Sequence, residues 1–140
     1  MGNQQILLIV LSVIIVSISV VGAVGLFQLH AAKANRAAII QDIHEISLQA
    51  VTYYKSPTSL GGGDGNWDPE GIYTWCGYPI SDNGRYILTA NGEILIREQV
   101  NGSLIIEGWG TEIGYDRDNL IYARLILIGP SGEFTFEILN

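Results

Sequence analysis

The chain has one cysteine, two histidines and few cations among its 140 residues. Cys76 has no partner within the chain, so an intrachain disulfide is excluded and stability must come from packing or assembly. Seven lysines and arginines stand against 14 aspartates and glutamates, which gives a formal net charge of -7. Because phosphate binding requires clustered cations, this balance argues against nucleic acid as a partner.

Formal charge is also absent from residues 6–27, a run of 22 mostly aliphatic residues near the amino terminus. As an α-helix rising ~1.5 Å per residue, this run spans about 33 Å, enough for the roughly 30 Å hydrocarbon core of a bilayer. Residues 1–5 carry no basic side chain, and the run is too long for a cleaved signal, so we expect the segment to be retained. Such a helix requires lipid or other copies of the chain around it.

The predicted helix continues past the apolar run, because alanines are frequent there and no proline interrupts it. Isoleucines such as Ile39 and Ile43 recur on one face, with polar residues on the others, which predicts an amphipathic stem. We expect one helix over about residues 6–54. Gly22 and Gly25 are its weakest positions, where we expect a bend or a melted turn.

Beyond the stem the sequence changes to a period of two, with turn signals such as Asn91-Gly92. The predicted antiparallel strands are residues 85–90, 93–100, 103–109, 120–128 and 133–139. Only the stem is available to cover the buried face of this sheet, so we predict an α+β fold. The expected parts are an apolar helix at 1–30, a stem at 31–56, a glycine- and aromatic-rich connector loop at 57–84 and a β-sheet head at 85–140.

Small residues in the apolar run allow close helix packing, which favours assembly of identical chains. The expected assembly residues are Ile6, Leu7, Leu8, Leu11, Ser12, Ile15, Ser19, Gly22, Gly25 and Phe27. Four aromatic residues of the connector form a candidate interface between heads, or alternatively cover an edge of a small core. They are Trp67, Tyr73, Trp75 and Tyr78.

Few residues carry a chemical signal. His30 and His44 both lie on the stem, so the head has no imidazole for catalysis or zinc binding, and we expect neither an enzyme nor a cofactor. Carboxylate-only hydrolysis by pairs such as Asp116 and Asp118, or Glu107 and Glu112, stays open as an alternative. Asp64, Asn66, Asp68 and Glu70 have the alternating spacing of a calcium loop without its turn glycine or final glutamate. Asn101 begins an N-glycosylation tripeptide.

An apolar amino-terminal helix that continues into an amphipathic stem, followed by a glycine-rich connector and a β-rich head, resembles the type IV pilins. The likeness spans the chain as an architecture, through the apolar run, the stem between Ala34 and Tyr54, and the connector with Pro57. Pilins have a glutamate at the fifth mature position, where this chain has Gln5 if Met1 is the mature terminus. A glutamine supplies hydrogen bonds but no countercharge. Gln4 and Gln5 are therefore the expected polar contacts of the amino-terminal end.

The resemblance implies a structural subunit of an extracellular filament. Its partners would be copies of itself in a helical homopolymer, the membrane before assembly and the pilus assembly machinery. The chain would lie at the cell surface, with an inner-membrane pool. The alternative is a single-pass membrane-anchored accessory or binding protein, such as a minor pilin or pseudopilin of a secretion system. Lys33 and Arg36 follow the apolar run, and this charge bias favours a cytoplasmic head, so outward export requires a removed basic leader or dedicated machinery.

Overall fold

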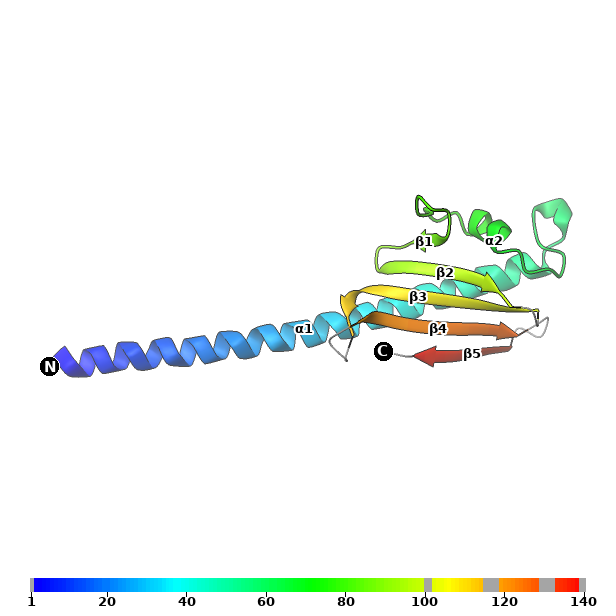
Figure 1. Cartoon of the computed structure of the whole chain (residues 1–140). Coiled ribbons are helices and arrows are strands. Elements are labelled where there is room, and N and C mark those ends of the chain that lie inside the picture. The colour runs from blue at the N-terminus through cyan, green and yellow to red at the C-terminus, as the bar shows by residue number, and fades with distance from the viewer. Residues whose placement is uncertain (1, 100–101, 115–118, 129–132, 139–140) are drawn as a thin grey trace.

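The computed structural model describes residues 2–99, 102–114, 119–128 and 133–138. It shows one long helix, α1 (Gly2–Lys55), whose N-terminal half projects alone and whose C-terminal half lies against a five-stranded antiparallel sheet (Figure 1). The α+β arrangement expected from the sequence is confirmed. Helix and sheet form the two layers that a small head of this kind requires.

Helix α1 has 54 residues and runs through Gly22 and Gly25 without interruption. The melted turn, one of the two expectations at these glycines, is therefore wrong. A Cβ at either position would meet no other atom within 4 Å, so no part of the described head pulls the helix out of line there. With ordinary helix formers on both sides, a cost of about 1 kcal/mol per glycine does not break the hydrogen-bond ladder.

The sheet has the simple order β1-β2-β3-β4-β5, so every strand pairs with its neighbour in sequence. The strands are β1 (Tyr86–Leu88), β2 (Gly92–Glu98), β3 (Ser103–Ile113), β4 (Leu120–Ile128) and β5 (Glu133–Ile138). All five predicted strands are present. β3 runs past its predicted end at Trp109, through a register shift between Trp109 and Ile113.

The core lies between α1 and one face of the sheet, where Ile39, Ile43 and Ile46 are fully buried. Glycine makes this close contact feasible. A Cβ on Gly108 would lie 2.7 Å from Cδ1 of Ile43, and one on Gly92 would lie 2.8 Å from Cδ1 of Ile39. The isoleucines of the stem therefore pack directly onto the backbone of β2 and β3.

We expected the connector to be a loop, but the structure shows that part of it is helical. It contains a 3-10 turn, η1 (Thr58–Leu60), and a two-turn helix, α2 (Pro69–Cys76). Proline at the first position of α2 and the Asp68 side chain, which accepts from the Glu70 amide at 3.2 Å, start this helix. The glycine-rich context concealed this start signal.

Candidate functional site

The apolar half of α1 has no packing partner within the described chain. Residues 2–30 are all exposed, and α1 is the one described helix that is long and apolar enough to cross a membrane. The expected assembly residues all lie on this projecting part, as do Gln4 and Gln5 on its first turns. Because these side chains point outward all round the helix, the head cannot bury them.

The serine hydroxyls of this segment are satisfied within the helix. Ser12 donates to the Ile9 carbonyl at 2.8 Å, and Ser19 donates to the Ile15 carbonyl at 2.8 Å. Ser17 makes the same kind of bond, at 2.7 Å. An apolar environment therefore incurs no penalty for an unpaired hydroxyl along this segment.

Asn35 fastens the helix to the sheet at the point where the projecting segment begins. Its Nδ2 donates to the Asn91 carbonyl at 2.9 Å and to Oγ1 of Thr111 at 3.2 Å. Its Oδ1 accepts from the amides of Thr111 at 3.1 Å and Glu112 at 3.3 Å. Gly110 leaves room for this amide, because a Cβ there would lie 2.1 Å from Oδ1. One side chain thus joins α1 to the ends of β2 and β3.

The sheet face opposite α1 carries an ionic cluster around Glu107. Gly108 faces α1, so its neighbour Glu107 points to the other face. The Glu107 side chain is only 3% exposed, and its carboxylate accepts hydrogen bonds from Arg97, Tyr122 and Arg124. The Arg124 Nη2 lies 2.9 Å from Oε1. Burial alone raises the pKa of Glu107, but these donors outweigh it and hold the pKa below its ordinary value.

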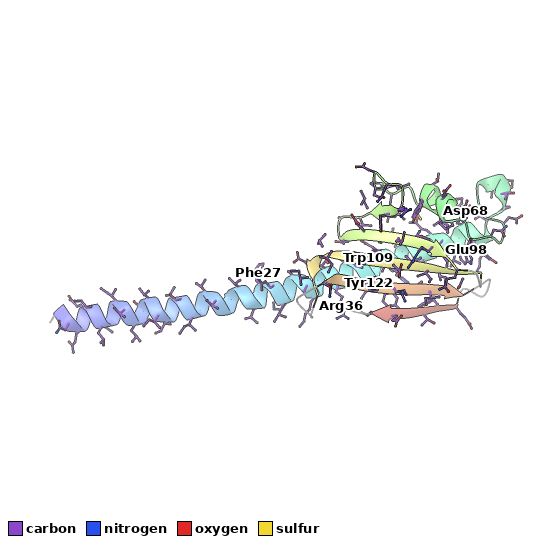
Figure 2. The ribbon with its side chains drawn as sticks, viewed as in Figure 1. Phe27, Arg36, Asp68, Glu98, Trp109 and Tyr122 are labelled. Carbon is purple, nitrogen blue, oxygen red and sulfur yellow. The ribbon has the colours of Figure 1, made fainter. Side chains whose placement is uncertain are left out.

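Aromatic rings continue this cluster across the same face. The ring centroids of Trp109 and Tyr122 are 5.2 Å apart, and Tyr86 meets Trp109 edge-on at 6.1 Å. The Arg124 guanidinium lies 5.7 Å from the Tyr122 ring centroid. Trp109 and Tyr122 lie together on the sheet in Figure 2. With every Glu107 oxygen engaged, the cluster stiffens the sheet face and leaves no free carboxylate for proton transfer.

The connector aromatics are mostly core residues. Trp67 and Tyr73 are buried, and Tyr73 binds the Ile96 amide at 3.1 Å and the Arg85 carbonyl at 2.7 Å. Tyr78 is partly buried and donates to Glu45 at 3.0 Å. The alternative role of these residues, covering part of a small core, therefore fits their placement, and Trp75 is the one aromatic of the four that is exposed.

The other candidate residues do not gather into a site. Asp68 caps α2, and Asp64 adopts a left-handed backbone in a turn, with φ 49. Among the described residues no group of three or more histidine, cysteine, aspartate or glutamate side chains is placed to hold a metal. Asn101, Asp116 and Asp118 lie outside the described residues.

Cys76 is half-buried. Burial, aided by the charge of Glu45, raises the pKa of its thiol to about 11. Glu112 lies beside α1, in a hollow that it shares with Phe27, and so stands apart from the Glu107 cluster. His30 and His44 are exposed on α1, and His44 meets Phe134 of β5 edge-on at 6.1 Å. None of these groups is arranged as a nucleophile with its base.

The fold defines a class by geometry alone: a helical rod with an apolar free half and an antiparallel sheet clamped to its other half. Comparison with protein-family models, with curated proteins and with solved structures finds no match to this chain. The Asn35 clamp and the Glu107 cluster were not predicted from the sequence. The signal for Glu107 was a single acidic residue inside the apolar run of β3, which becomes meaningful only when the strand register places two arginines beside it.

Proposed function

We propose that this chain is the structural subunit of an extracellular type IV pilus-like filament. The observation that carries the proposal is the uninterrupted helix α1, half of which holds the head while the other half is apolar on every side. When identical rods bury these halves against each other, each aliphatic side chain removed from water contributes about 1.5 to 3 kcal/mol. Subunits related by a rotation that does not close form an open helical fibre.

The clamped junction supports this proposal physically. A filament transmits load from its helical core to its surface through the place where each head joins its helix. Here Asn35 makes four hydrogen bonds across that place, and the isoleucines of the stem pack directly on the sheet. A freely swivelling anchor has no need of such a junction.

A membrane-anchored accessory protein is the second candidate. The length of residues 6–27 favours it, since about 33 Å of apolar helix matches the hydrocarbon core of a bilayer. In that case the apolar helix stays in lipid, and the head works as a monomer or as a minor component at the membrane surface. We propose no catalytic role for either candidate.

Microscopy and fractionation of the native source separate the two candidates. Material sheared from the cell surface is imaged by negative stain and labelled with an antibody against the head. Long uniform fibres that bind the antibody are expected. Recovery of the chain only in the membrane fraction, with no labelled fibres, contradicts the filament and supports the anchor. Val13→Asp should abolish the fibres, because an acidic residue in the apolar helix costs about 2.5 to 3.5 kcal/mol, and Val13→Leu should retain them.

A further inference from the structure

An open hollow lies at the neck, where the projecting part of α1 meets the sheet. It has a volume of about 380 Å³, and its walls are Ala23, Val24, Phe27, Gln28 and Ala31 of α1 and Glu112 of β3. Phe27 is 80% exposed on its rim. Figure 2 shows Phe27 on the bare helix just before the head begins. The hollow is mostly apolar, so water is a poor occupant.

The far end of the head carries an apolar side chain held outward. Leu60 ends the turn η1, directly beyond the C-terminus of α1, and is 71% exposed. The turn is closed by backbone hydrogen bonds: the Leu60 and Gly62 amides donate to the Pro57 carbonyl at 3.0 and 3.1 Å. A Cβ on Gly62 would lie 2.3 Å from the Ser56 carbonyl oxygen, so the turn folds tightly onto the helix end. An ordered turn thus presents a leucine to solvent.

The spacing of these two features fits a second copy. Phe27 and the end of α1 at Lys55 are 28 residues apart, about 42 Å at ~1.5 Å per residue. A copy shifted by this distance along the helix places its residues 6–27 beside the stem of the first copy. The outer face of that stem exposes Ala34, Ala37, Gln41 and Leu48, which carry no charge. It also exposes Glu45, whose carboxylate accepts a hydrogen bond from Tyr78 of its own head at 3.0 Å. An apolar helix along this face therefore meets mostly uncharged side chains and one carboxylate at its border.

The charges of the two ends are also complementary. The described residues at the far end include the exposed carboxylates Asp64, Asp68, Glu70 and Glu98 and two cations, Lys55 and Arg97, of which Arg97 is paired with Glu107. The described charged residues at the neck are Lys33, Arg36 and Glu112. Figure 2 places Arg36 at the neck and both Asp68 and Glu98 toward the opposite end of the head. An acidic far end approaching a neck with two cations is attracted, whereas two far ends repel.

We propose that the neck hollow of one copy receives Leu60 of a second copy, so that heads stack end to end along the filament. The contact is heterologous, because the neck of each copy meets the far end of another, and it repeats without closing. Lys33 and Arg36 face the acidic far end of the partner copy around this apolar centre. This inference rests on the proposed function, since the stacking requires a filament.

Cysteine cross-linking of purified filaments tests the contact. In a Cys76→Ser background, Phe27→Cys and Leu60→Cys are combined in one chain and the filaments are mildly oxidised. Within one chain these positions are about 42 Å or more apart, far beyond the reach of a disulfide, so every cross-link joins two copies. A ladder of multimers is expected on denaturing gels. Leu48→Cys with Leu60→Cys is the matched control, since Leu48 is also well exposed but lies outside the contact.

The outcomes separate the contact from the filament itself. No ladder from the Phe27 and Leu60 pair in intact filaments, or an equal ladder from the control pair, overturns the stacking and leaves the filament standing. Failure of the parent chain to form filaments contradicts the proposed function. As a second readout, Leu60→Asp should shorten filaments several-fold while the near-ultraviolet circular dichroism of the head stays unchanged, and Leu60→Met should not. Unaltered filament length in Leu60→Asp also overturns the contact.

Discussion

Replacing Glu107 with glutamine should destabilise the head more than any other single loss of charge among the described residues. Glutamine keeps the size of the side chain but removes the charge that Arg97 and Arg124 neutralise. It also places an amide nitrogen against their donors. Hydrogen bonds to a charged group contribute about 1.5 to 3 kcal/mol each, but Arg97 is 55% exposed and water replaces part of what it loses. We therefore expect a loss of about 2 kcal/mol at neutral pH.

The dependence on pH gives this prediction a second signature. Because the pKa of Glu107 is lowered by folding, its contribution is fully present above the ordinary pKa of about 4.5 and is lost as pH falls through the lower folded pKa. The difference between wild type and Glu107→Gln should therefore be constant from pH 7 to about pH 5 and shrink in more acidic buffer. In acid the free energy of unfolding of the wild type falls toward that of Glu107→Gln, because only the wild type loses the contribution of this carboxylate.

Thermal unfolding of the full chain in a mild non-ionic detergent measures this effect. It is followed by near-ultraviolet circular dichroism, to which Trp109 and Tyr122 contribute. For a head of roughly 100 residues, a loss of about 2 kcal/mol corresponds to a Tm lower by roughly 8 to 16 °C. Glu137→Gln is the matched control, since Glu137 is 51% exposed and lies 3.9 Å from Arg124. It should cost less than about 0.5 kcal/mol. Equal Tm values for both variants, or a Glu107→Gln difference that persists undiminished at low pH, would refute the reasoning.

Three further outcomes are expected. Asn35→Ala should cost about 2 to 3 kcal/mol in the same unfolding assay, since four hydrogen bonds are lost, and Asn35→Asp less, because the Thr111 and Glu112 amides keep their acceptor; equal losses would contradict the clamp. Gly108→Ala should cost about 1 to 3 kcal/mol by overpacking Ile43, and adding Ile43→Val should recover part of it; no recovery would place the strain elsewhere. Cys76, with its pKa raised to about 11, should react with a thiol reagent at pH 7.5 much more slowly than a cysteine introduced at Leu60 in the Cys76→Ser background, and as fast once the head is unfolded.

Most of the fold could be predicted from the periodicity of apolar residues along the sequence. The isoleucine stripe of the stem and the alternation in β4 each have one dominant physical cause, burial of a single face, and both are confirmed, by Ile39 and Ile43 and by the alternating burial of β4. In β5 the same alternation does not lead to burial, because Phe134 and Ile138 are exposed. The helix α2 was missed because it is only eight residues long and glycines precede it. The sequence signal for its start is the Asp68-Pro69 pair, a local capping signal inside a segment that otherwise resembles a loop.

No local sequence pattern indicated the long-range contacts. Asn35 meets Thr111 across 76 positions in the chain, and Glu107 meets Arg124 across 17. Which polar residue becomes buried depends on strand register and on where glycines let the helix approach. Period-two patterning gives the face of a strand but not its partner. The strand end at Ile113 was missed for the same reason, because the register shift after Trp109 breaks the alternation.

Under the proposed function, folding and assembly use separate halves of α1. The buried residues of the helix run from Ala32 to Tyr53, and none lies in residues 6–27, so the apolar half contributes no burial to the described head. Val13→Asp should therefore leave the Tm of the head in detergent within about 0.5 kcal/mol of wild type, as for a surface change away from packed features. A substitution at Ile43 should lower that Tm before it affects any filament. Were Val13→Asp to unfold the head, the two halves would be coupled, and the loss of fibres in that variant could not be assigned to helix packing.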